Sequence, residues 1–168
     1  FDGVMASEVG AAPTGFDEET LFMMGALARS CEMAGALEVM LEISVTYSQD
    51  RVAFERPISK FQAVQHNLAR LAGEVAAAVC AASSAADALQ RAGGFDEDVF
   101  FEIAAAKIRT GEAAGEGAGI AHQVHGAIGF TMEHILQRYS RRVWSWRDEF
   151  GSESVWAVRL GEAVAAKG

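Results

Sequence analysis

The chain has 168 residues and a mass of 17.9 kDa, and 51% of its residues are hydrophobic. A chain of this length and composition can bury a core of its own, which excludes a disordered or collagen-like protein. Its 23 acidic and 14 basic residues give a net charge of −9, which excludes nucleic acid as an expected partner because phosphate backbones require clustered Lys and Arg. Only two prolines occur and alanine is abundant, so the sequence predicts an all-α fold.

Residues 1–16 are rich in Gly, Ala and Pro without periodicity, which predicts a linker or the remnant of a preceding domain. Residues 17–168 are predicted to form one helical bundle domain. Because the chain begins at Phe1 instead of Met and has no basic segment followed by an apolar one, we expect a segment before it but no signal peptide. No run of about 18 uncharged apolar residues occurs, so no membrane span is expected.

Two long helices are predicted in the first half of the chain. Asp17 can cap the first helix, in which apolar residues recur at three- and four-residue steps to about Gln49. Pro57 is expected at the start of the second helix, where a missing N–H is tolerated. A regular apolar seam, typical of coiled-coil-like packing, continues along that helix until Gly93 ends it.

A third long helix and two short ones are predicted in the second half. Asp96 can cap the third helix, and Gly126 breaks its pattern. The glycines inside this helix, each of which weakens it by up to about 1 kcal/mol, are expected to admit a neighbouring helix or a ligand. A shorter helix over about 133–146 and a last helix capped by Ser152 complete an up-down four-helix bundle with short extra helices.

The second half also contains residues that could carry chemistry. His122 and His125 stand one helical turn apart, but no Asp or Glu completes an obvious ligand set, so no metal site is predicted. The glycine-rich segment 126–129 exposes backbone N–H groups that suit a pyrophosphate, but a plain helix cap explains the same glycines more often.

Other candidate residues have an ordinary interpretation when taken alone. Arg51 is then a solvated charge, and Phe54 and Gln62 are packing and surface residues. Cys31 and Cys80 lie in apolar helical stretches, which predicts buried thiols in a reducing cytosol. From the residues alone, the sequence predicts a soluble, oligomeric helical bundle.

Three segments in register carry a resemblance to a known family. Residues 47–62, YSQDRVAFERPISKFQ, are similar to the signature Y-x-x-x-R-x-x-F-x-x-P-I-x-x-x-Q of the C-terminal helical domain of acyl-CoA dehydrogenases. Residues 121–130, AHQVHGAIGF, are similar to the Gln-x-x-Gly-Gly-x-Gly-Phe/Tyr pattern of the same domain. The arginine-rich stretch around Arg141 is followed at the family's spacing by Gly151-Ser152, and the resemblance covers about residues 17–165.

This resemblance implies a flavoenzyme of fatty-acid, lipid or steroid metabolism. Family members have a helical N-terminal domain, a middle β-domain and this C-terminal bundle, and they form homo- or hetero-tetramers. They remove the α-proton of an acyl-CoA thioester while the β-hydrogen leaves as hydride to FAD, which yields a trans-2-enoyl-CoA. An electron-transferring flavoprotein then accepts the electrons. The family implies a cytoplasmic, bacterial protein, with the mitochondrial matrix left open.

The resemblance also implies FAD contacts near the end of the first helix. Arg51 would pair with the FAD pyrophosphate, because a guanidinium fork suits phosphate oxygens. Phe54 and Gln62 would flank the ADP half of the cofactor.

Further FAD contacts are implied in the second half of the chain. Gln123, Gly126 and Ala127 would supply amide and backbone contacts from the partner side, and Ser152 would lie near the FAD as the last helix begins. Ala127 departs from the family, which has a second glycine there, and its methyl group narrows the approach to the cofactor.

The position of the catalytic base is the larger departure. Most family members have a Glu directly before the Gly-Ser pair, where this chain has Phe150, and a minority place it at the position of Gly25. Phe and Gly cannot accept a proton, so the usual general base is absent. Glu149 is the candidate catalytic base, with a solvated charge as its ordinary interpretation. Alternatively, the chain is the base-less partner in a mixed tetramer or a pure assembly module.

Overall fold

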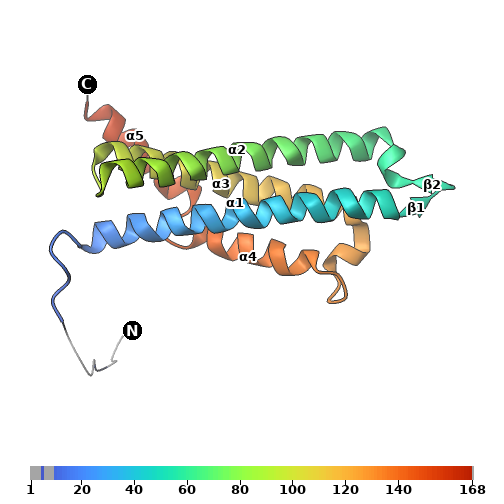
Figure 1. Cartoon of the computed structure of the whole chain (residues 1–168), viewed down its shortest axis with the longest axis horizontal. Helices are drawn as coiled ribbons and strands as arrows, with labels where there is room; N and C mark the ends of the chain where they lie inside the picture. Colours follow the sequence, from blue (N-terminus) through green and yellow to red (C-terminus); the bar gives the residue numbers. More distant parts are fainter. Residues whose placement is uncertain (1–4, 6–9, 168) are drawn as a thin grey trace.

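The computed structural model describes residue 5 and residues 10–167 (Figure 1), so most of the predicted linker 1–16 lies outside the described residues. Residues 10–16 form no helix or strand, and the helices follow from there. The described residues form the α-helices α1 (Glu18–Asp50), α2 (Gln62–Ala92), α3 (Glu97–His125), α4 (Leu136–Asp148) and α5 (Glu153–Ala165). Short elements connect them, namely β1 (Val52–Ala53), β2 (Arg56–Pro57) and the 3-10 helices η1 (Ile58–Lys60) and η2 (Gly126–Phe130).

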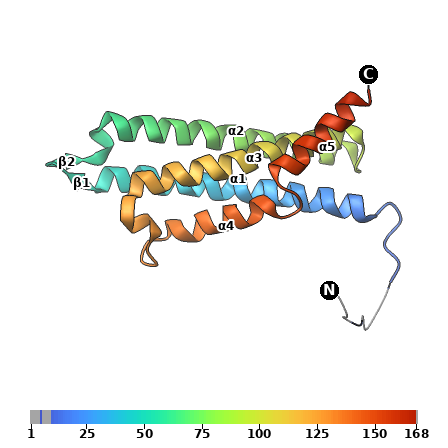
Figure 2. The same cartoon turned by 180° about the vertical axis from the view of Figure 1, so that it is seen from behind.

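The predicted all-α, up-down bundle is confirmed. Helices α1, α2 and α3 run alongside one another with alternating direction, and α4 returns along α1 (Figures 1 and 2). Helix α3 is central, because it packs against each of the other four α-helices. The short α5 packs on α3 near the end at which the chain enters α1.

The helix boundaries that depend on local capping rules are confirmed. The Asp17 carboxylate accepts a hydrogen bond from the Thr20 N–H at 2.8 Å, which lowers the pKa of Asp17. The Asp96 carboxylate accepts one from the Val99 N–H at 2.9 Å. Gly93 ends α2 with a left-handed φ of 66°.

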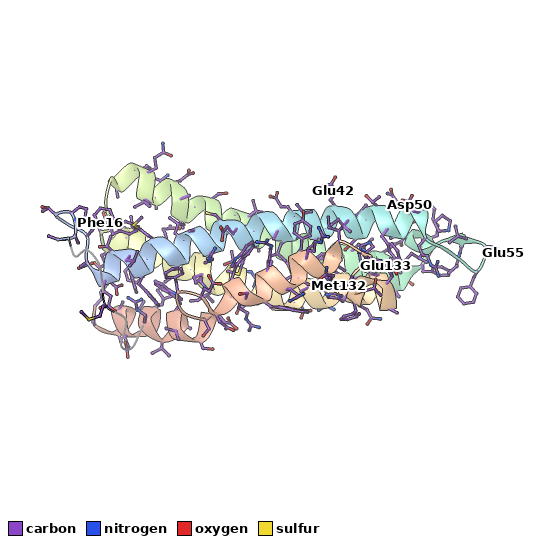
Figure 3. All side chains as sticks on the ribbon, turned by 90° about the horizontal axis from the view of Figure 1, so that it is seen from below. Phe16, Glu42, Asp50, Glu55, Met132 and Glu133 are labelled. Atoms are coloured by element: carbon purple, nitrogen blue, oxygen red, sulfur yellow. The ribbon has the colours of Figure 1, made fainter. Side chains whose placement is uncertain are left out.

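The predicted helix start at Pro57 is wrong. Pro57 has φ −54° and ψ 139°, an extended conformation, and it pairs with Val52 in an antiparallel hairpin. The turn of this hairpin is formed by Phe54 (φ 52°) and Glu55 (φ 62°), as a tight two-residue hairpin turn requires. One turn of η1 then precedes α2, which begins at Gln62. Figure 3 shows Glu55 at the tip of the hairpin, beyond the end of the bundle.

The fourth helix is also shifted relative to its prediction, since α4 runs from Leu136 to Asp148 instead of from about 133 to 146. Residues 131–135 form turns, and the backbone N–H of Leu136 donates to the His134 ring at 3.2 Å. This bond pairs one of the backbone N–H groups at the start of α4, which have no partner within the helix.

Two apolar clusters occupy the bundle. One gathers around Leu37, Leu71 and Val143, and the other around Ile103 and Trp156. Within the first, a Cβ on Gly117 would meet Leu37 at 2.9 Å and Leu71 at 3.2 Å, so α1, α2 and α3 pack closely at that glycine. This confirms the expected close approach at Gly117. A Cβ on Gly119 would face open space, so close packing does not explain that glycine.

The exposure of the two cysteines differs from the prediction. Cys31 and Cys80 are free but exposed, so the predicted burial of both thiols is wrong; a helical apolar run does not specify which face turns inward.

Among the described residues one helix, α2, is long and apolar enough to cross a membrane by length and composition, with 28% of the relevant window buried. Because α2 packs against α1 and α3 in the bundle, this similarity to a membrane span is weak evidence for one.

Candidate functional site

One end of the bundle gathers most of the predicted cofactor contacts. The Tyr47 ring stacks on the His125 ring with centroids 4.4 Å apart, which joins the end of α1 to the end of α3. Arg51 follows α1 directly, and Gly126 follows α3 directly. Gln62 begins α2 after the hairpin at the same end (Figure 1).

The backbone of Arg51 is anchored while its side chain is exposed. Its N–H donates to Tyr47 O at 2.9 Å, and its carbonyl accepts from the Ile58 N–H at 2.8 Å. Within the described part of the chain, no carboxylate forms an ion pair with the Arg51 guanidinium. Phe54 is 89% exposed and has an edge contact only with Phe61 among its aromatic neighbours in that part of the chain. Both side chains therefore extend outward from a fixed hairpin.

A groove of about 420 Å³, called here the η2 groove, lies beside this hairpin end. It is lined by Gly119, His122, Gln123, Gly126, Ala127, Phe130 and Trp144. Gly126 has φ 65° and ψ −147°, a conformation that a residue with a side chain rarely adopts. A Cβ on Gly126 or on Gly119 would meet nothing within 4 Å, so the backbone there is open to a ligand.

Aromatic rings form the wall of the η2 groove. The His122 ring is parallel to the Phe130 ring at 4.1 Å and to the Trp144 ring at 5.7 Å. His122 Nε2 lies 2.9 Å from Ser140 Oγ, and His125 Nδ1 lies 2.8 Å from Ala121 O. Burial lowers the pKa of both histidines, so both are neutral near pH 7.

The same two histidines leave one nitrogen each without a partner. His122 Nδ1 and His125 Nε2 are buried and make no hydrogen bond to the described residues. His122 lies on the wall of the η2 groove, whereas the ring of His125 is covered by Tyr47. The sequence did not identify Phe130 and Trp144 as groove residues, because only the bundle brings the end of α3 beside α4.

A second region is the junction between α4 and α5. Phe150 has φ 54° and Gly151 has φ 86°, so two consecutive residues with positive φ connect α4 to α5. The Phe150 carbonyl accepts a hydrogen bond from Trp156 Nε1 at 2.8 Å. The Phe150 ring lies directly on Gly25 of α1 and leaves no room for a Cβ at that position. The two positions considered for a catalytic carboxylate thus contact each other.

Glu149 and Ser152 flank this junction. Glu149 Oε2 accepts a hydrogen bond from Arg29 Nε at 2.7 Å and forms an ion pair with Arg29 Nη2 at 2.6 Å, and Glu149 Oε1 accepts a hydrogen bond from Ser145 Oγ at 3.2 Å. Ser152 is the N-cap residue of α5, as predicted, but its side chain makes no capping hydrogen bond. The junction lies beside Gly25, which is separated from Arg51 by roughly 40 Å of helix. The bundle therefore does not bring Ser152 to the other predicted cofactor contacts.

The fold and these two regions define a helical bundle domain whose motif residues lie at the hairpin end and at the junction between α4 and α5. The family model described as "Acyl-CoA dehydrogenase, C-terminal domain" matches residues 16–164. The chain belongs to the acyl-CoA dehydrogenase family.

Individual relatives agree with this assignment. The acyl-CoA dehydrogenase IpdE2 of Mycolicibacterium smegmatis is 36% identical over 140 residues, which cover 79% of this chain and 40% of that protein. The butyryl-CoA dehydrogenase structure from Megasphaera elsdenii has a TM-score of 0.78 at 26% identity and covers 86% of this chain and 38% of its own. A chain of the ChsE4-ChsE5 complex from Mycobacterium tuberculosis has a TM-score of 0.72 at 26% identity, with the same coverages. The chain thus spans about two fifths of the length of these relatives.

Proposed function

We propose that this chain is the C-terminal FAD-contacting and oligomer-forming domain of an acyl-CoA dehydrogenase that converts an acyl-CoA thioester to a trans-2-enoyl-CoA. The observation that carries the proposal is the hairpin end of the bundle, where an anchored Arg51, an exposed Phe54 and the open η2 groove all face outward. When bound, FAD supplies the hydride acceptor of the reaction. The acyl-CoA and an electron-transferring flavoprotein are proposed as partners, mainly through domains outside this chain.

The donor groups at the hairpin end fit a dinucleotide. Arg51 offers a guanidinium without a carboxylate partner in the described part of the chain, and Gly126 offers open backbone. The exposed amide of Gln123 lines the same groove. Ala127 is exposed as well, so its methyl group narrows the η2 groove without closing it.

The distance between the two regions supports an oligomer. Gly25, beside which the junction with Ser152 lies, is separated from Arg51 by roughly 40 Å along α1, which is longer than one extended dinucleotide. One FAD molecule therefore cannot contact both residues of a single chain. We propose that the hairpin end reaches the FAD of a neighbouring subunit while Ser152 lies near the FAD of its own subunit. Such an arrangement makes a tetramer or other oligomer part of the cofactor site.

The experiment that tests the FAD proposal uses the full-length protein. Arg51→Ala is expected to lower the flavin content at least several-fold, because a charge-assisted contact to phosphate is lost. Arg91→Ala is the matched control, since Arg91 is an exposed arginine at the opposite end of α2. If Arg51→Ala keeps full flavin content and oligomer size, the bundle is a pure assembly module instead. The isolated chain is expected to show no acyl-CoA-dependent dye reduction.

A second candidate function is the base-less subunit of a mixed oligomer. The observation that favours it is the contact between Phe150 and Gly25, which fills both positions considered for the base with groups that bind no proton. Glu149 remains the candidate base of this chain, but it is held in an ion pair with Arg29 that it would have to leave in order to accept a proton. Turnover of the full-length homo-oligomer that is lost in Glu149→Gln would establish Glu149. Absence of turnover until a second subunit is added would establish the base-less subunit.

The relatives agree with parts of this proposal. The ChsE4-ChsE5 structure is named as a complex of two proteins, which supports a hetero-oligomer as one outcome. The bacterial source of the relatives supports a cytoplasmic location in a bacterium.

A further inference from the structure

Lys107 of α3 is a lysine with no exposed surface, in the middle of the bundle. Its Nζ donates a hydrogen bond to Arg147 O at 2.6 Å and a longer one to Trp146 O at 3.4 Å. None of the ion pairs within the described part of the chain includes Lys107. Lysines are almost never fully buried without a charged partner, so the backbone carbonyls of α4 are what retain this ammonium.

The two carbonyls belong to the last turn of α4. The last carbonyls of a helix have no partner within the helix, and they form the negative end of its dipole. The C-cap residue of α4, Glu149, is extended with φ −66° and ψ 136°. Lys107 therefore supplies, from another helix, a donor to the last carbonyls of α4 and a positive charge at the negative end of its dipole, in addition to Arg147 of α4 itself.

The end of α4 leads directly into the left-handed pair Phe150 and Gly151. On the far side of this pair, Trp156 Nε1 holds the Phe150 carbonyl at 2.8 Å, and Arg147 Nε donates to Glu153 Oε2 at 2.9 Å. A residue with a side chain, such as Phe150, keeps a positive φ only where the surrounding contacts hold its backbone there. Lys107 thus holds the chain before Phe150, and α5 holds it after Gly151.

We infer that Lys107 is a positioning residue, whose ammonium holds the last turn of α4 and so determines where residue 150 lies over Gly25. A methionine would fill a similar space without the cost of removing a charge from water. The importance of residue 150 for the reaction rests on the proposed function, whereas the positioning itself is a property of this chain alone.

The charges around Lys107 come from three elements. Glu153 of α5, together with Asp148 and Glu149 at the end of α4, favours the ammonium, and Arg147 opposes it. Arg29 of α1 is paired with Glu149 and lies behind it. Burial outweighs the favourable carboxylates and lowers the pKa of Lys107 to about 8. The neutral amine can still donate, but without charge assistance the bonds to the carbonyls are weaker.

The test uses chain 1–168, with the Trp156 indole N–H signal in NMR spectra as the report on the junction. In the wild type this signal is expected to shift between pH 6.5 and 9.5 with a midpoint near 8. Lys107→Met removes that transition, while Lys167→Met, which changes an exposed lysine, retains it. At pH 7, amide hydrogen exchange over residues 148–152 is expected to be at least tenfold faster in Lys107→Met than in Lys167→Met.

Two results would overturn the inference. One is a folded Lys107→Met protein whose exchange over 148–152 stays within twofold of the Lys167→Met control. The other is a wild-type Trp156 signal that does not follow the titration of Lys107, and this measurement decides the matter even if Lys107→Met does not fold. Neither measurement involves flavin, so failure here is distinguishable from failure of the FAD proposal.

Discussion

Replacing Gly25 by alanine is expected to destabilise the bundle only while the Phe150 ring is present. The ring lies on Gly25, so an added methyl group must displace it. Forcing a methyl group into filled space costs about 1–3 kcal/mol, and alanine in a helix interior returns about 1 kcal/mol relative to glycine. The expected net change in the free energy of unfolding is therefore a loss of up to about 2 kcal/mol.

The same substitution should change sign in a Phe150→Ala background. With the ring removed, the three atoms nearest to a Cβ at position 25 are absent, and the gain of about 1 kcal/mol from helix propensity remains. The double-mutant cycle should accordingly give a coupling energy of about 1–3 kcal/mol between Gly25 and Phe150. Urea unfolding followed by far-UV circular dichroism measures all four proteins.

Gly35 provides the matched control for this cycle. It lies on the same helix, and a Cβ there would meet nothing within 4 Å, so Gly35→Ala should be stabilising in both backgrounds. If Gly25→Ala behaves like Gly35→Ala with Phe150 in place, the ring does not occupy the space over Gly25. In that case one contact between Gly25 and Phe150 would not fill both positions considered for the base.

Three further predictions concern stability. Because burial lowers the pKa of Lys107 from 10.5 to about 8, the unfolded chain binds more protons between these values, and the free energy of unfolding should rise with pH by up to about 3 kcal/mol relative to Lys107→Met. Urea titrations at pH 7.5 and 10 should show this difference, and parallel pH profiles would contradict it. Asp96→Ala should cost about 1 kcal/mol by removing the bond to the Val99 N–H, while Asp87→Ala on an exposed helix face should be near neutral. Gly117→Ala should cost about 1–3 kcal/mol, whereas Gly119→Ala, facing open space, should not destabilise the bundle.

Local rules of helix capping were sufficient to predict much of the fold. Asp17, Asp96 and Gly93 act within a few residues of their own positions, so their roles follow from the neighbouring sequence. Pro57 was misplaced because a proline after a charged segment suits either a first helical turn or an extended strand. The pairing of Val52 with Pro57, which decides between them, depends on a turn with two left-handed residues that lacks glycine.

Only those parts of the site that are contiguous in the sequence could be predicted, because the rest depends on packing between distant segments. The hairpin and η2 residues are predictable because each motif is contiguous in the sequence. Lys107 stands in a helical segment where a lysine normally lies on the surface, and only the packing of α4 and α5 on α3 buries it. The contact between Gly25 and Phe150 joins segments that are distant in the sequence, and no local pattern in either predicts it. Long-range packing thus determines the junction.

The structure of the junction bears on the choice between the two proposed functions. A connection that only had to join α4 to α5 would not need a buried lysine, and it would not need a phenylalanine at positive φ, since both cost stability. These features keep the backbone of residue 150 fixed although its side chain cannot accept a proton. A fixed backbone at residue 150 without a carboxylate is what a base-less subunit would require. Its junction would then shape a wall beside a ligand while the proton was removed elsewhere. The junction is consistent with the base-less subunit proposed above, whereas in the homo-oligomer Glu149, held by Arg29, would have to leave its ion pair in order to act.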